Sequence, residues 1–261
     1  MIDLNKGKIA FKEYISQYDT SDDKIKLKLV HTYGVVAAAE FICKNEGLSR
    51  EDTDLAMLIA LLHDIGRFEQ LKKFNSFDDN KFDHASFGVK VLFEDGLIGK
   101  FIETSKYDEI IRKAIEYHSR FKIPEGNNEK EELHIKLIRD ADKLDNFRVK
   151  KFEKFETLFD ISEEVLGAEG ISENIIENVR NHEPILHINR KTFMDMWVSY
   201  LAFIFDLNFR ASYLFLKEND YINSNINRIN YTNPKTIVSI EEIRIVLLNF
   251  IDKNLSYKIE S

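Results

Sequence analysis

The residues in this sequence with the clearest chemical potential are histidines and aspartates at or near the expected ends of helices. His63 and Asp64 directly follow an apolar run from Leu55 to Leu62. One similar residue lies upstream and three lie downstream: His31, His84, His118 and Asp142. Imidazole nitrogens and carboxylate oxygens bind borderline divalent metals such as iron, manganese, cobalt and zinc. Because an ionised carboxylate beside apolar residues is costly without a partner, the pattern predicts a metal-dependent enzyme.

Helices are the elements expected to position these residues, because the chain has only ten Gly and three Pro. Apolar residues spaced three or four apart support this expectation. The predicted helices cover residues 25–46, 49–65, 84–93, 107–118 and 129–148.

Local signals set the expected ends of these helices. Gly47 stands where a C-terminal cap belongs, and Gly66 is a plausible stop for the second helix. Ser49 precedes Asp52 by three residues, which is a capping-box pattern. The polar segment 75–83 is predicted to be a loop.

Composition limits the classes of function. The chain has 261 residues and a formal net charge of −8, which argues against general nucleic-acid or anionic-membrane binding. Cys43 is the sole cysteine, so a reducing cytoplasm is the expected location. The most apolar stretch elsewhere, residues 193–209, is interrupted by Asp195 and is predicted to be a buried helix rather than a membrane span.

Each histidine, taken alone, has an ordinary structural interpretation. His31 could be a satisfied core or surface histidine, and His84 could belong to the capping region of its helix. His118 could be a favourable cation at a helix C-terminus.

The distant aspartate is also ambiguous when its spacing alone is considered. Asp142 could pair with Arg139 or Lys143, and Asp140 and Asp145 are competing candidates for the same role. Spacing does not choose among the three aspartates.

Taken together, these residues resemble a known pattern. The string His31…Leu61-Leu62-His63-Asp64-Ile65-Gly66-Arg67…Ala141-Asp142-Lys143-Leu144-Asp145 resembles the HD-domain superfamily of metal-dependent phosphohydrolases. The resemblance covers roughly residues 25–150. The distant aspartate of the family lies in an Ala-Asp context, which favours Asp142. It implies that His31, His63, Asp64 and Asp142 bind a first metal. The expected fold is an all-α, HD-domain-like helical bundle, with further helices over 151–261 in a single domain spanning 1–261.

Some HD proteins place two further histidines between the doublet and the last aspartate, where they bind a second metal bridged by the doublet aspartate. His84 and His118 match those positions. The resemblance therefore implies two divalent transition metals per chain, drawn from Fe, Mn, Co, Ni or Zn. The Gly-Tyr-Pro motif of the HD-GYP branch is absent from the sequence. The remaining histidines match nothing in the pattern: His134, His182 and His187.

The expected reaction is hydrolysis of a small phosphorylated molecule, such as a nucleotide, by a metal-activated hydroxide, with Asp64 as the central catalytic residue. Arg67, Arg120 and Lys143 are candidate substrate-binding cations, although each could be a solvated surface charge. Loop phenylalanines could stack a base or simply pack: Phe74, Phe77 and Phe82. The sequence assigns no oligomeric state.

Two other functions fit the same ligand set. A minority of HD proteins use it as a di-iron oxygenase, which would oxidise a carbon substrate. The chain could also be a non-catalytic, nucleotide-binding regulatory module. The intact ligand set favours hydrolysis over this last alternative.

Overall fold

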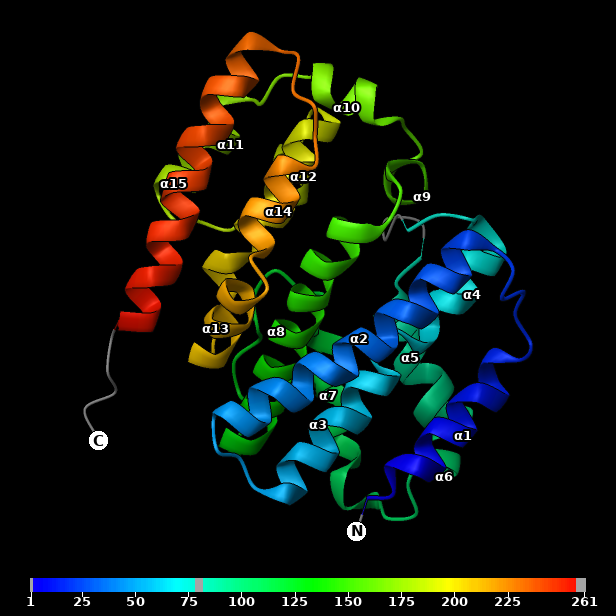
Figure 1. Cartoon of the computed structure of the whole chain (residues 1–261). Helices are drawn as coiled ribbons and strands as arrows, with labels where there is room; N and C mark the ends of the chain where they lie inside the picture. The colour runs from blue at the N-terminus through cyan, green and yellow to red at the C-terminus, as the bar shows by residue number, and fades with distance from the viewer. Residues whose placement is uncertain (1, 78–81, 257–261) are drawn as a thin grey trace. The chain divides into compact units, whose positions relative to one another are not determined.

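The computed structural model describes residues 2–77 and 82–256 of the chain (Figure 1). Across these residues the regular elements are helices and none is a strand, which confirms the predicted all-α fold. The chain divides into two compact units, Met1–Asp145 and Asn146–Ser261. The single domain expected over residues 1–261 stays a prediction.

The first unit contains all of the predicted metal-binding residues. Its elements are α1 (Leu4–Ile15), α2 (Asp23–Asn45), α3 (Arg50–Leu62), α4 (Ile65–Phe74), α5 (His84–Val89), a π-helical turn (Lys90–Glu94), α6 (Ile98–Phe101), a 3-10 turn (Ser105–Tyr107), α7 (Asp108–Tyr117) and most of α8 (Glu129–Phe152). Helix α1 has no counterpart among the helices predicted from sequence.

Helix α3 forms the centre of the first unit. Every residue from Leu55 to Leu62 is buried, so this end of the helix is apolar on all sides and must be covered on all sides. Helices α1, α2 and α7 pack against it (Figure 1). His63 and Asp64 come directly after this buried segment, so two polar side chains lie at the end of an apolar core.

The helix ends are partly as predicted. Gly47 and Gly96 have φ angles of +68° and +77°, which suits glycine and ends the preceding helical segments. Ser49 caps α3 and accepts a hydrogen bond from the backbone N–H of Asp52 at 3.1 Å. The predicted boundaries at Gly47 and Ser49 are confirmed.

The prediction that Gly66 stops a helix was wrong. Helix α3 ends at Leu62, the chain turns at His63 and Asp64, and Gly66 lies in the first turn of the next helix, α4. Its role is close packing. A Cβ atom at this position would overlap the carbonyl oxygen of His84 and would lie 2.8 Å from the backbone nitrogen of Gly88. Glycine therefore lets α4 approach α5 at the point where α5 presents His84.

Replacing Gly66 with alanine is expected to destabilise the chain by about 1–3 kcal/mol, because the added methyl group pushes backbone against backbone. Chemical denaturation measures this change. Gly99→Ala is the matched control, since a Cβ at Gly99 would meet nothing within 4 Å. If the two variants unfold at the same denaturant concentration, the close packing at Gly66 does not restrict this position to glycine.

The second unit is also helical. After the end of α8 it contains α9 (Phe155–Phe159), α10 (Glu163–Ala168), α11 (Glu173–Arg180), a 3-10 turn (His187–Asn189), α12 (Phe193–Leu201), a 3-10 turn (Ala202–Asp206), α13 (Arg210–Glu218), α14 (Tyr221–Asn227) and α15 (Pro234–Ser256). Its core includes Trp197, which is 1% exposed and lies edge-on to Phe155 and Phe159.

The apolar segment 193–209 is a buried helix at its start, as predicted, but α12 ends at Leu201 and a 3-10 turn follows. Asp195 is fully buried and acts as an anchor. It accepts hydrogen bonds from the backbone N–H and hydroxyl of Ser172, at 2.8 and 2.7 Å. Among the described helices, none is both long and apolar enough to cross a membrane.

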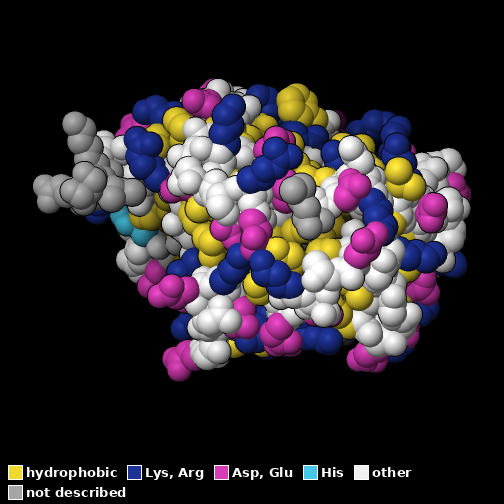
Figure 2. Space-filling view, turned by 90° about the horizontal axis from the view of Figure 1, so that it is seen from below, with side chains coloured by type: hydrophobic (Ala, Val, Ile, Leu, Met, Phe, Trp, Pro, Cys, Tyr) yellow, Lys and Arg dark blue, Asp and Glu magenta, His cyan; other side chains and the backbone are white. Residues whose placement is uncertain are grey.

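Figure 2 shows one face of the molecule, on which Lys and Arg side chains are interspersed with Asp and Glu side chains. The visible part of this face therefore has mixed charge. A continuous basic surface, as binding to a nucleic-acid backbone requires, is not seen there.

Candidate metal centre

The structure brings all six predicted ligands together within the first unit. His31 lies inside α2, while the other five stand at or near helix ends or on α8. His63 follows α3, Asp64 precedes α4, His84 begins α5, His118 follows α7 and Asp142 lies on α8. Five of these side chains are at most 3% exposed, whereas that of Asp142 is 23% exposed. The cluster is thus buried, with Asp142 at its most open edge.

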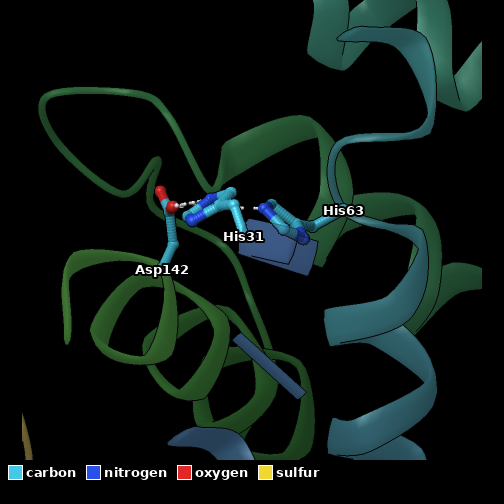
Figure 3. Close-up of side chains that lie close together, drawn as sticks. All are labelled: His31, His63 and Asp142. Atoms are coloured by element: carbon cyan, nitrogen blue, oxygen red, sulfur yellow. Dashed lines mark ion pairs between the residues drawn. The ribbon is translucent and has the colours of Figure 1, made fainter. Parts of the chain in front are cut away.

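Three of the ligands form one group, shown in Figure 3, where the His31 ring lies between Asp142 and His63. Nε2 of His31 is 3.0 Å from Oδ1 of Asp142, and Nε2 of His63 is 4.0 Å from the same oxygen. One donor atom from each residue lies within 4.8 Å of the others. This spacing suits three ligands of one metal ion.

The two carboxylate oxygens of Asp64 face different histidines. Oδ2 lies 3.4 Å from Nε2 of His63 and 3.8 Å from Nε2 of His31. Oδ1 lies 3.3 Å from Nε2 of His84 and 3.8 Å from Nε2 of His118. A single carboxylate therefore connects the His31 side of the cluster with the His84 side.

Hydrogen bonds at Nδ1 hold three of these rings in place. His63 and His118 each donate from Nδ1 to the backbone carbonyl oxygen three residues earlier, in both cases at 2.7 Å. Nδ1 of His31 is 2.7 Å from Oδ2 of Asp145. Since carbonyl oxygens only accept, the proton of His63 and of His118 sits on Nδ1. Their Nε2 lone pairs are then available to a metal.

Two of the three competing aspartates on α8 contact the His31 ring. Asp142 faces Nε2 of His31, inside the cluster, whereas Asp145 contacts the opposite ring nitrogen. Asp145 therefore acts as a positioning residue for His31, a role that sequence reasoning did not assign to it. Its spacing of three from Asp142 is the signal, because residues three apart on a helix share a face.

The electrostatics of the carboxylates favour their ionised form. Burial raises the pKa of Asp64, but the Lys28 ammonium and the His63 ring outweigh it and hold that pKa well below the usual value. Burial likewise opposes ionisation of Asp142, and the contact with His31 lowers its pKa overall. Both residues are thus carboxylates at neutral pH, as metal binding requires.

Lys28 is a second residue that sequence reasoning missed. Its Nζ donates to Oδ2 of Asp64 at 2.6 Å, and its side chain is 15% exposed. The ammonium also lies 5.7 Å from the centre of the Phe77 ring. Lys28 precedes His31 by three residues, so one helical turn of α2 presents both side chains to the cluster.

The three predicted substrate-binding cations occupy different environments. Arg67 is 8% exposed, its Nε lies 3.7 Å from Oδ1 of Asp64, and an NH2 atom lies 3.0 Å from Nε2 of His84. Arg120 is about half exposed and pairs with Glu116 at 2.9 Å. Lys143 is 8% exposed, and its Nζ donates to the carbonyl oxygen of Arg139. Only Arg67 of the three contacts the cluster in these interactions, and all three assignments stay predictions.

The aromatic residues of the predicted loop mostly pack on one another. The ring of Phe82 lies 5.9 Å from that of Phe74 and 5.0 Å from that of Phe87. Residues 78–81 of this loop lie outside those described. These contacts agree with the packing interpretation, and base stacking stays a prediction.

The donor atoms of the cluster fit a borderline divalent metal. Nε2 of His31 and Nε2 of His63 are buried and have no hydrogen-bond partner among the described residues. Buried polar atoms are usually satisfied, so two ring nitrogens that face carboxylates without a hydrogen bond of ordinary geometry fit the binding of a cation. A mixed set of imidazoles and carboxylates matches iron, manganese, cobalt, nickel and zinc.

His134 lies apart from this cluster, as sequence reasoning expected. It is fully buried on α8, and its Nε2 is 3.3 Å from Oδ1 of Asp52. Burial lowers the pKa of His134 to about 4, although the Asp52 contact acts in the opposite direction. The folded chain therefore binds a proton at this site less readily than the unfolded chain, whose histidine has a pKa near 6.5.

His134 is expected to make the fold less stable as pH falls. The contribution of His134 to the unfolding free energy is fully present above about pH 6.5. It declines as pH drops toward 4, because over this range the unfolded chain takes up a proton on His134 and the folded chain does not. Between pH 7 and 5, the unfolding free energy of the wild type should fall by about 1–2 kcal/mol more than that of His134→Gln. Urea denaturation at both pH values tests this, and parallel pH profiles would contradict it.

The comparisons agree with this geometry. The fold and cluster define a helical protein with a buried His/Asp site able to hold metal. The family model of the HD domain matches residues 29–146, which include all six candidate ligands. This match supports membership of the HD-domain superfamily for residues 29–146, and that superfamily consists mostly of metal-dependent hydrolases. No curated protein and no solved structure matches the chain significantly.

Proposed function

We propose that this protein is a metal-dependent phosphohydrolase, a phosphomonoesterase or phosphodiesterase acting on a nucleotide or a related small phosphoester. One observation carries the proposal: the two oxygens of Asp64 face two separate pairs of histidines. A carboxylate in this position suits a bridge between two ions. A two-metal centre is a common device for phosphoester hydrolysis.

The proposed ligands divide at Asp64. His31, His63 and Asp142 together with Asp64 would hold a first metal, and His84 and His118 together with Asp64 would hold a second. When bound, a pair of divalent ions acidifies water and polarises a phosphoryl oxygen.

Other residues of the protein position the ligands of this site and exclude water from it. Asp145 fixes the ring of His31, and Gly66 lets α5 approach closely enough to present His84. The apolar end of α3 excludes water from beneath His63. Arg67 is the best supported of the proposed substrate-binding cations, because its guanidinium lies beside both Asp64 and His84.

The first test is elemental mass spectrometry of protein purified without chelators or a His tag, followed by a phosphate-release screen. We expect close to two transition metals per chain and turnover of at least one nucleotide or small phosphoester. The screen should contain phosphomonoesters and phosphodiesters, each tested with Mn²⁺, Co²⁺, Fe²⁺, Ni²⁺ and Zn²⁺.

Other outcomes would redirect the assignment. One metal per chain would restrict the site to the His31 side. Iron with substrate-dependent oxygen consumption and no phosphate release would indicate the oxygenase alternative. Failure to bind any of the five metals would overturn the enzymatic proposal.

A further inference from the structure

The ammonium of Lys28 occupies one of the two ends of the Asp64 carboxylate. Its Nζ is 2.6 Å from Oδ2, closer than any histidine nitrogen comes to that oxygen. The oxygen is also the one that faces the proposed first metal. Lys28 and that metal therefore compete for the same lone pairs.

Lys28 also lies toward the open edge of the cluster. Its side chain is 15% exposed and that of Asp142 is 23% exposed, whereas the other cluster ligands are at most 3% exposed. A small molecule approaching the cluster from solvent would thus meet Asp142 and Lys28 first. Of these two, Lys28 is the one that attracts an anion.

We propose that Lys28 is a placeholder cation that yields Asp64 to the first metal and then binds a phosphoryl group of the ligand. The inference rests on the proposed two-metal function and adds a residue to its substrate-binding site. A lysine suits both tasks, because its charge is compact and its four-carbon stem can move the ammonium without moving α2.

Charge balance links the release of Asp64 by Lys28 to the binding of a phosphoryl group by the same ammonium. The Lys28 ammonium would lose Asp64 as its partner if that carboxylate held a divalent ion, and it has no other acid partner among the described residues. The stem is anchored one turn before His31, so the displaced ammonium remains near the metal ligands. An anionic oxygen bound there would restore the neutralisation that Asp64 had provided.

The proposal predicts two shifts of opposite sign when Lys28 is replaced with methionine. Mn²⁺ should bind the first-metal site about tenfold more strongly, because its competitor for Asp64 is gone. Inorganic phosphate should bind the Mn²⁺-loaded variant about tenfold more weakly, because a charge-assisted hydrogen bond is lost. Isothermal titration calorimetry measures both affinities, without relying on turnover.

Two further variants separate this role from a merely structural one. Lys26→Met removes the same charge from an exposed position on α2, and both of its affinities should stay at wild-type values. Lys28→Arg retains the charge, and its affinities should lie closer to the wild type than those of Lys28→Met. Lys28→Gln is titrated in the same way if circular dichroism shows that Lys28→Met is not folded.

The titrations distinguish the failure of this inference from the failure of the proposed function. If wild-type protein binds no metal, both are overturned. If the wild type binds two metals but Lys28→Met binds Mn²⁺ no more strongly, Lys28 does not compete with it and the inference alone is wrong. Unchanged phosphate affinity in Lys28→Met would likewise overturn the inference.

Discussion

Replacing Asp64 with alanine is expected to abolish phosphoester hydrolysis and to remove most of the bound metal. The two oxygens of Asp64 face both pairs of histidines, so its loss affects both proposed metals. We expect turnover to fall by about a thousandfold or more. The far-ultraviolet circular dichroism spectrum should change little, because the buried apolar residues of α3 remain in place.

Asp54→Ala is the matched control for this experiment. Asp54 lies on α3 outside the cluster, where its carboxylate is 3.7 Å from Arg50. Its replacement should leave metal content and turnover at wild-type values. Retained turnover in Asp64→Ala, measured at saturating metal, would contradict the proposed mechanism.

The double variant His84→Asn/His118→Asn is expected to bind about half as much metal as the wild type. These two histidines face Oδ1 of Asp64, away from His31, so their loss should empty one position only. The remaining ligands at Oδ2 and Asp142 still support a first metal. Elemental mass spectrometry of the purified variant gives the stoichiometry directly, and we expect hydrolysis to be lost with the second ion.

Histidines outside the cluster provide the control for this pair. His182 and His187 are exposed in the second unit, and asparagine tolerates the left-handed φ of +57° at His182. His182→Asn/His187→Asn should keep the full metal content. Equal stoichiometry in the two double variants would reject the two-metal arrangement and leave a single metal on the His31 side.

The candidate ligands could be predicted from sequence because their type and spacing are themselves informative. The His63-Asp64 doublet follows an apolar run that must be buried, so both side chains reach a protected site at a helix end. The structure brings the distant residues His31, His84, His118 and Asp142 to the same place. Their role as metal ligands stays a proposal.

Lys28 and Asp145 could not be assigned in the same way. Both are common surface residue types, and nothing in a single sequence distinguishes a lysine that reaches inward from one in solvent. Their roles depend on how α2 and α8 are rotated about their axes, which only the packed structure gives. The spacing of three from a ligand was visible, but it fits many surface residues equally well.

Gly66 shows a different limit of sequence reasoning. A glycine soon after an apolar run is a reasonable helix stop, since glycine is common at helix ends. Here it lies in the first turn of a new helix instead, because a backbone from elsewhere in the chain needs the space of its missing side chain. A requirement set by tertiary packing cannot be recognised from the neighbouring residues in the sequence.

The hydrogen bonds at Nδ1 of His31, His63 and His118 have a consequence for the thermodynamics of ligand binding. Each ring gives up its rotational freedom when the chain folds, before any cation arrives. The conformational entropy of ordering these side chains is therefore a cost of folding and not of metal binding. The three rings are preorganised, so the affinity for a cation reflects coordination, desolvation and the proposed displacement of Lys28 far more than the ordering of these histidines.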